Sequence, residues 1–195
     1  MKNVNIMIVG VGGQGTLLAS RILGNAILSL GYDVKVSEVH GMSQRGGSVV
    51  TYVKYGEKVY SPVIDKGEAD IILAFEQLEA LRALPYLKMG GKMIANTQKI
   101  NPMPVITGAA TYPEGILETL SAKVDLTALD ALAMAKAAGN TKAVNVVLMG
   151  VMAKNTNIPY ETWVNAVREC VPAKFLEANL RAFDAGYRYA EEALQ

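Results

Sequence analysis

Cysteine and histidine are almost absent from this sequence. Cys170 is the single cysteine among 195 residues, and His40 is the single histidine. One thiol cannot form an intramolecular disulfide or a thiolate cluster within the chain, and this cysteine usage is typical of a cytoplasmic protein. One histidine without a closely spaced acidic set also excludes most metal sites that proteins build. Cluster-based redox chemistry would therefore need ligands from another chain.

An excess of one charge and a long apolar run are also missing. The 19 basic and 18 acidic residues give a net charge of +1 and form no long block of one sign. No electrostatic footprint for nucleic acid or an anionic membrane is therefore present. The apolar stretch 143–153 is far shorter than the roughly 20 residues that span a bilayer. Lys2 precedes an apolar run, but the early glycine cluster favours a buried strand over a signal peptide. We expect a soluble cytoplasmic protein.

Apolar residues make up 51% of the chain, which is enough for one globular domain over residues 1–195. Short apolar runs predict buried strands at 4–9, 34–39, 69–75 and 92–96. Helical patterns predict helices over 14–30 and 76–87, with a turn at Gly90-Gly91. This alternation of strands and helices favours an α/β, Rossmann-like layered fold.

One stretch departs from a simple nucleotide-binding pattern. Residues 48–55 and 59–64 flank Gly56-Glu57-Lys58 and predict a β-hairpin where a crossover helix would be expected. The sheet is therefore predicted to be mostly parallel but mixed.

The C-terminal segment, about 158–195, is predicted to be helical and docked on the domain. Apolar residues recur there at spacings of three and four after Pro172, namely Leu176, Leu180, Phe183, Tyr187, Ala190 and Leu194. Such a stripe is typical of packing against the protein's own core. A partner surface is the alternative interpretation.

The sequence IMIVGVGGQGTLL has the G-x-G-x-x-G spacing between a predicted strand and a predicted helix. Its candidate binding residues are Gly10, Gly12, Gly13, Gln14 and Gly15. Glycines allow backbone N–H groups to approach an anion, and the helix N-terminus adds a partial positive charge. Alternatively, the glycines only permit close packing of helix on sheet. Glu38 could bind a ribose hydroxyl, which keeps NAD(P) or FAD as an alternative that the hairpin disfavours.

A second polar loop follows the strand 34–39. It contains His40, Ser43, Gln44, Arg45, Gly46 and Gly47. A parallel strand would bring this loop to the same sheet edge as the glycine turn. The guanidinium of Arg45 suits a phosphate or carboxylate, although a solvated loop with a surface ion pair is the alternative. His40 has no partner nucleophile, and we identify no catalytic residue in the chain.

Three stretches together resemble a known family. They are GVGGQGTLLASRIL, EVHGMSQRGGSVVTYVKYG and GEADIILAFEQLEALRALPYLKMGGKMIAN. The chain resembles the gamma-type subunit of 2-oxoacid:ferredoxin oxidoreductases, and its His-Gly-Met-x-Gln-Arg-Gly-Gly loop is most similar to that of the small beta subunit of the indolepyruvate enzymes. The clear resemblance covers residues 4–155, and the helical tail matches less well.

The resemblance implies a subunit that is not catalytic alone. The complex would convert an aryl 2-oxoacid, coenzyme A and oxidised ferredoxin into acyl-CoA, CO2 and reduced ferredoxin. A larger partner subunit would hold thiamine diphosphate and iron–sulfur clusters, and the candidate residues of this chain would face it or contact coenzyme A. The alternatives are a gamma subunit for pyruvate, 2-oxoglutarate or 2-oxoisovalerate, a free-standing NAD(P)-binding oxidoreductase, and a regulatory ligand-binding module.

Overall fold

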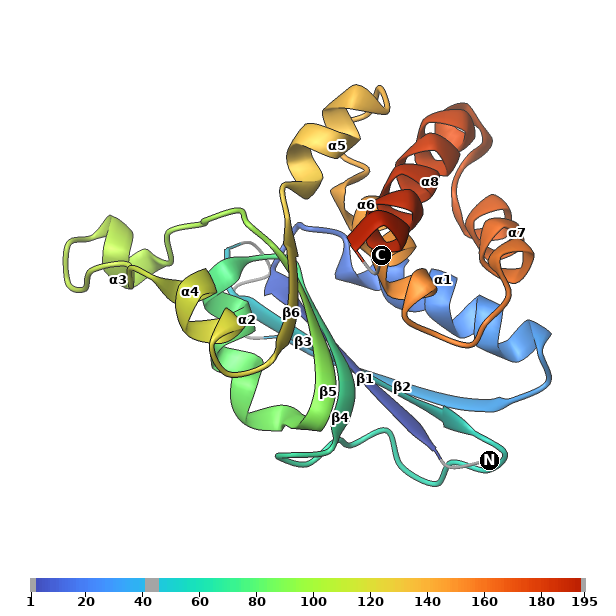
Figure 1. The fold of residues 1–195 in the computed structure, drawn as a ribbon, viewed down its shortest axis with the longest axis horizontal. Coiled ribbons are helices and arrows are strands. Elements are labelled where there is room, and N and C mark those ends of the chain that lie inside the picture. Colours follow the sequence, from blue (N-terminus) through green and yellow to red (C-terminus); the bar gives the residue numbers. More distant parts are fainter. Residues whose placement is uncertain (1–2, 41–45, 194–195) are drawn as a thin grey trace.

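A computed structural model describes residues 3–40 and 46–193. A central β-sheet carries helices on both faces (Figure 1). Within the described residues the sheet has six strands in the order β2-β3-β1-β4-β5-β6. The strands are β1 (Val4–Val11), β2 (Asp33–His40), β3 (Ser48–Gly56), β4 (Ala69–Ala74), β5 (Leu87–Asn96) and β6 (Asp125–Leu129). The predicted α/β layered fold is confirmed.

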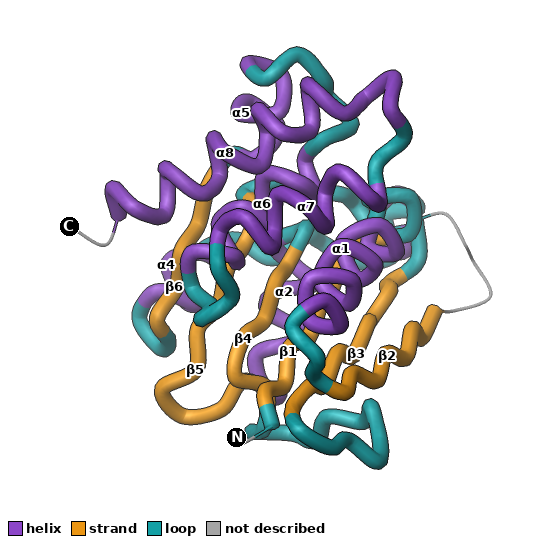
Figure 2. The backbone as a smooth tube through the Cα atoms, turned by 90° about the vertical axis from the view of Figure 1, so that its right-hand side faces the viewer, coloured by secondary structure: helices purple, strands orange, loops and turns teal. Residues whose placement is uncertain are grey.

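The sheet is mixed, as the sequence predicts. Strands β1, β4, β5 and β6 are parallel, whereas β3 is antiparallel to both β1 and β2. Strand β2 therefore runs in the same direction as β1, although β3 lies between them. The central strands are almost wholly buried because helices cover both faces (Figure 2).

The predicted hairpin partner at 59–64 is wrong, because residues 57–68 contain no strand. Strand β3 pairs along its full length with β2 instead, from Asp33 opposite Gly56 to His40 opposite Val49. Pro62 has no N–H to donate to a sheet, and the Asp33 carboxylate accepts the Val59 N–H at 2.9 Å. The side chains of Val59 and Ile64 are buried from this loop, which explains the strand-like apolar pattern.

The predicted turn at Gly90-Gly91 is also wrong. Both glycines lie inside β5, where the pairing with β4 jumps from Leu87 opposite Ala69 to Lys92 opposite Ile71. Gly90 has φ +76, so the chain bulges there without ending the strand. The half-buried strand β6 was not predicted from the sequence, because its five residues lack a continuous apolar run.

The helices divide between the two faces. One face is covered by α1 (Thr16–Ser29), α5 (Ala131–Ala137), α6 (Val144–Lys154), α7 (Tyr160–Cys170) and α8 (Leu176–Ala193). The other face is covered by α2 (Gln77–Ala83), the short 3-10 turn Leu84–Tyr86 and α4 (Ile116–Ser121). Helix α3 (Met103–Ile106) stands apart from both layers (Figure 1).

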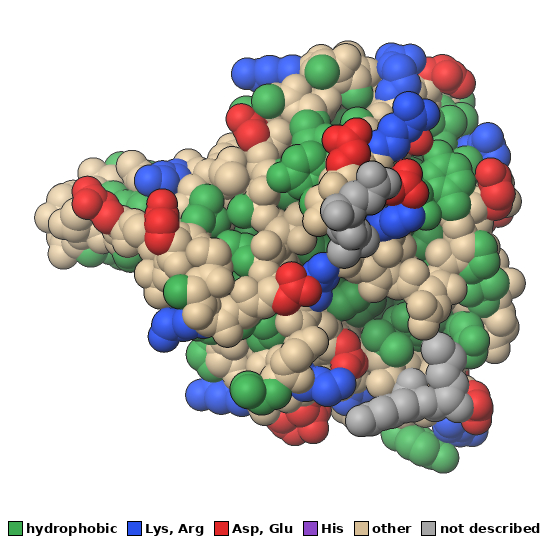
Figure 3. All heavy atoms as spheres, in the orientation of Figure 1, with side chains coloured by type: hydrophobic (Ala, Val, Ile, Leu, Met, Phe, Trp, Pro, Cys, Tyr) green, Lys and Arg blue, Asp and Glu red, His purple; other side chains and the backbone are tan. Residues whose placement is uncertain are grey.

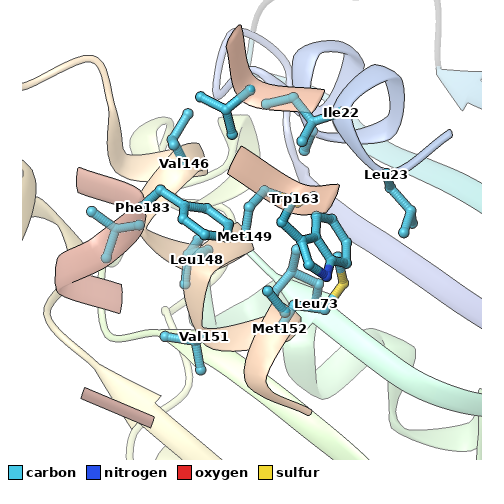
Figure 4. Packing of buried hydrophobic residues seen from close by; sticks show 14 of the residues in the cluster. Ile22, Leu23, Leu73, Val146, Leu148, Met149, Val151, Met152, Trp163 and Phe183 are labelled. Carbon is cyan, nitrogen blue, oxygen red and sulfur yellow. The ribbon is translucent and has the colours of Figure 1, made fainter. Parts of the chain in front are cut away.

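Helix α6 forms the centre of the larger core. Its residues from Asn145 to Ala153 are all buried, and Trp163 and Phe183 pack beside them (Figure 4). In α8, Phe183 and Ala190 are buried and Leu176, Leu180 and Tyr187 pack against the same core, so the predicted stripe is confirmed as core packing. Leu194 lies outside the described residues. No helix in the described part of the chain is both long and apolar enough to cross a membrane.

Candidate functional site

The glycine turn joins the end of β1 to the start of α1. Gly13 and Gly15 have φ +100 and +85, which side chains rarely tolerate. The Gln14 side chain braces the turn, because its Oε1 accepts the Val11 N–H at 2.7 Å and its Nε2 donates to the Phe75 carbonyl at 3.0 Å. The turn is thus tied to the end of β4. Both polar atoms of the Gln14 amide therefore bond to the backbone, so this side chain shapes the turn.

The N-terminus of α1 lies at this turn. Gly15 is its N-cap, and no side chain of the described residues caps the helix. The first-turn N–H groups have no helical carbonyl to donate to, and they carry the positive end of the helix dipole. The side chain of Asn145 packs directly against Gly15, because a Cβ added to Gly15 would lie 2.6 Å from Asn145 Nδ2. That Nδ2 donates to the Gly15 carbonyl at 3.2 Å, which fixes the start of α6 against the start of α1.

A cavity of about 410 Å³ adjoins this turn. Its lining includes Gly13, Gly15, Gln98, Thr141 and Lys142. Lys142 is exposed, and its ammonium forms no ion pair with any residue that the structure describes. Sequence reasoning missed Gln98, Lys142 and Asn145, because they are distant in the chain from the glycine turn: Gln98 and Lys142 lie in loops, and Asn145 lies in the first turn of α6. The cavity therefore combines backbone N–H groups of the glycine turn with the exposed ammonium group of Lys142.

The second loop meets the glycine turn, as predicted. The Gly12 N–H donates to the Gly47 carbonyl at 2.8 Å, and the Gly46 N–H donates to the Gly12 carbonyl at 3.4 Å. These bonds confirm that the two segments share one edge of the sheet. His40 is the last residue of β2. Ser43, Gln44 and Arg45 lie outside the described residues.

A buried acidic pair lies beside this junction and was also missed. Glu79 accepts from Ser48 Oγ at 2.6 Å and from Arg82 Nη1 at 2.6 Å, so it ties the start of β3 to α2. Glu76 is 1% exposed and accepts from the N–H groups of Glu79 at 3.0 Å and Ile100 at 3.1 Å. The position of Glu76 directly after the apolar run 69–75 could have indicated it, because parallel strands end at the ligand edge.

Tyr112 completes the environment of Glu76. Its hydroxyl donates to Glu76 Oε1. Burial raises the pKa of the Tyr112 phenol, and the hydrogen bond to Glu76 raises it further. A cavity of about 210 Å³ lies here, between Gly46 and Gly47 on one side and Pro102 and Met103 on the other. The acidic pair is therefore a hydrogen-bonded framework that holds the loops in place.

The structure does not support Glu38 as a ribose-binding residue, which was the main argument for a dinucleotide site. Glu38 lies on β2, two strands from β1, which corresponds to about 10 Å at the usual strand spacing. Its carboxylate accepts from Thr51 Oγ1 at 3.2 Å on the adjacent strand. The inserted strand β3 is the cause, because a ribose-binding acid belongs on the strand next to the glycine turn. In the described ranges, no group of three acidic, cysteine or histidine side chains could hold a metal ion.

Comparison with known proteins gives a consistent result. The family model described as pyruvate ferredoxin/flavodoxin oxidoreductase matches residues 5–189, so the match extends through the helical tail, beyond the expected limit at 155. Indolepyruvate oxidoreductase subunit IorB of Thermococcus kodakarensis is 45% identical over 202 residues, covering 100% of this chain and 99% of the relative. Ketoisovalerate oxidoreductase subunit VorA of Methanothermobacter marburgensis is 29% identical and matches over 38% of its own length. The keto/oxoacid ferredoxin oxidoreductase gamma subunit of Geobacter sulfurreducens has a TM-score of 0.74 at 26% identity, with 97% and 99% of the two chains covered.

Proposed function

The chain belongs to the pyruvate ferredoxin/flavodoxin oxidoreductase family, and on that premise we propose that it is the small subunit of an indolepyruvate:ferredoxin oxidoreductase. One observation carries the proposal: 45% identity to a subunit of that name over essentially the whole of both chains. The complex would cleave the bond between the carboxylate and the keto carbon of an aryl 2-oxoacid. CO2 leaves, the acyl group forms a thioester with coenzyme A, and the electron pair passes to ferredoxin.

The chemistry divides between two chains. One cysteine cannot ligate a four-cysteine cluster, so the iron–sulfur clusters belong on the larger subunit. We assign thiamine diphosphate to that subunit as well. The small subunit then contributes a structured face at the carboxyl edge of its sheet, where the glycine turn meets Gly46 and Gly47.

A phosphate of coenzyme A is the group that this edge suits. Coenzyme A supplies the thiol that takes up the acyl group. Donors and positive charge for a phosphate come from three places: the N-terminus of α1, the turn from Gly12 to Gly15, and the exposed ammonium group of Lys142. The cavity of about 410 Å³ is of a size for one segment of coenzyme A. We propose that the remainder of coenzyme A extends towards the larger subunit. The resemblance to the family implies that His40, Ser43, Gln44 and Arg45 also contribute to this interface.

Co-expression with the larger subunit tests the function. Tagged, anaerobic purification should recover an iron-containing companion, and the complex should reduce a viologen dye or ferredoxin with indolepyruvate only when coenzyme A is present. Pyruvate, 2-oxoglutarate and 2-oxoisovalerate are assayed beside it, because the VorA relative belongs to a ketoisovalerate enzyme. Faster turnover of one of these would reassign the substrate. Saturable NADH binding by the isolated chain, with no companion, would refute the proposal.

Charge removal tests the phosphate site. Lys142→Gln in the complex should raise the KM for coenzyme A about fivefold and leave kcat unchanged, because an exposed cation contributes uniform binding. Arg45→Ala should raise the same KM or weaken assembly. Lys66→Gln is the matched control, since Lys66 is exposed on the loop at the opposite edge. An unchanged KM for coenzyme A in Lys142→Gln would remove that residue from the site.

A further inference from the structure

A charge-free arm projects from the carboxyl edge of the sheet. Residues 100–113, which we call the arm, connect β5 to α4 and contain no Asp, Glu, Lys or Arg. Most of them are exposed. Figure 1 shows α3 at the end of this projection. Acidic and basic side chains are also visible on the projection in Figure 3, and they belong to residues outside 100–113. An exposed stretch of this length without charge is unusual for a solvated loop.

The arm is folded on itself. The Thr107 N–H donates to the Met103 carbonyl at 2.9 Å, and the Ala110 N–H donates to the Pro104 carbonyl at 3.0 Å. Prolines at 102, 104 and 113 fix further backbone angles and lower the entropy of the unfolded arm. The arm therefore has a defined shape in the absence of a partner.

One buried carboxylate closes the base of the arm. Glu76 Oε1 accepts from the Ile100 N–H at 3.1 Å and from the Tyr112 hydroxyl, so it bonds both ends of the arm. Glu76 also accepts the Glu79 N–H and thereby anchors the base to α2. Hydrogen bonds to a buried carboxylate are strong, so the arm is held at a fixed angle to the body. Such preorganisation lowers the entropic cost of binding.

The tip of the arm presents apolar side chains to solvent. Met103 is 63% exposed and Ile106 is 65% exposed. Depletion of charge together with projecting apolar side chains is the composition of the buried centre of a protein interface. The lack of Lys and Arg disfavours an anionic membrane surface or nucleic acid as the binding partner.

We propose that the arm is a docking element whose tip, Met103 and Ile106, inserts into an apolar pocket of the larger subunit. The inference rests on the proposed function. Two observations point to this partner. The first part of the arm, from Ile100 to Pro104, lines a cavity together with Gly46 and Gly47, so the arm continues the edge that we place against the larger subunit. The VorA relative carries the matching unit as 38% of a longer chain, so a separate chain of this kind must hold its neighbour by surface contacts.

The test measures assembly of the full-length chain with the larger subunit. The double variant Met103→Ser/Ile106→Ser should weaken the affinity about tenfold or more, because truncated central anchors dominate interface energies. The melting temperature of the isolated variant should stay unchanged, since both side chains are already exposed. Met103→Leu/Ile106→Leu should retain the wild-type affinity. Met89→Ser is the matched control, because Met89 is 96% exposed in the β5 bulge.

Three outcomes overturn this inference or its premise, and each is distinct. If the wild-type chain does not bind the larger subunit, the proposed function fails. If wild type and the double serine variant bind it equally well, the proposed function stands and the docking role of the arm is wrong. If the isolated chain sediments with phosphatidylcholine vesicles and the serine variant does not, while assembly is unaffected, the arm binds lipid and not the subunit.

Discussion

Replacing Gly150 by alanine should strongly destabilise the protein, because α6 and α8 cross in backbone contact there. A Cβ on Gly150 would lie 2.1 Å from the Phe183 carbonyl oxygen and 2.8 Å from the Tyr187 nitrogen. Ordinary contacts begin at 3.4 Å, so the helices would have to separate by about 1 Å. Overpacking a core costs about 1–3 kcal/mol, and the cost here lies at the upper end because rigid backbone must move.

The gain in helix propensity offsets part of this cost. Alanine is about 1 kcal/mol better than glycine inside a helix, which leaves a net loss of about 2 kcal/mol for Gly150→Ala. Gly24→Ala in α1 is the matched control, because nothing lies within 4 Å of its added Cβ. That variant should gain up to about 1 kcal/mol. The two substitutions are chemically identical and should have opposite signs.

Urea unfolding and thermal melting measure the two changes. For a chain of this length, Gly150→Ala should lower the melting temperature by about 4–8 °C, and Gly24→Ala should raise it by about 2–4 °C. Gly186 faces the same crossing, with an added Cβ 2.0 Å from the Val147 carbonyl oxygen. The double variant of Gly150 and Gly186 should lose less than the sum of the two single losses, since one separation relieves both clashes. A Gly150→Ala variant as stable as wild type would refute the geometry.

Three further predictions concern single side chains. Burial and Glu76 raise the pKa of Tyr112 above its usual 10.0, so its contribution to stability is complete below pH 10 and is lost as the pH rises through the folded-state pKa. The free energy of unfolding in urea should therefore fall above pH 10, and less so in Tyr112→Phe. Burial raises the pKa of the Cys170 thiol, so iodoacetamide should alkylate the native protein more slowly at pH 8 than the urea-unfolded protein; equal rates would contradict this. Trp163 is fully buried and its Nε1 has no hydrogen-bond partner among the described residues, so Trp163→Phe should lower the free energy of unfolding in urea by less than about 2 kcal/mol, against about 3–5 kcal/mol for Trp163→Ala. If Trp163→Phe were as unstable as Trp163→Ala, the unsatisfied indole N–H would not be destabilising the native protein.

The sequence was sufficient for features encoded by local pattern. The glycine turn lies between a buried strand and a helix, as its spacing predicts, and the stripe of α8 packs on the core. The meeting of the turn with Gly46 and Gly47 followed from one rule, that parallel strands end at one edge. These predictions succeeded because strand periodicity, glycine conformation and helix amphipathicity each depend on nearby residues.

Strand order and long-range contacts were decided only by the tertiary structure. Insertion of β3 between β1 and β2 moved Glu38 away from the glycine turn, and no local pattern distinguishes that order from direct pairing of β1 with β2. Glu76 bonds residues 24 and 36 positions further along the chain, and Asn145 reaches Gly15 across 130 positions. Such contacts exist because chain folding brings the ends of separate elements together, so the cavity, the acidic pair and the closed arm could be read only from the folded chain.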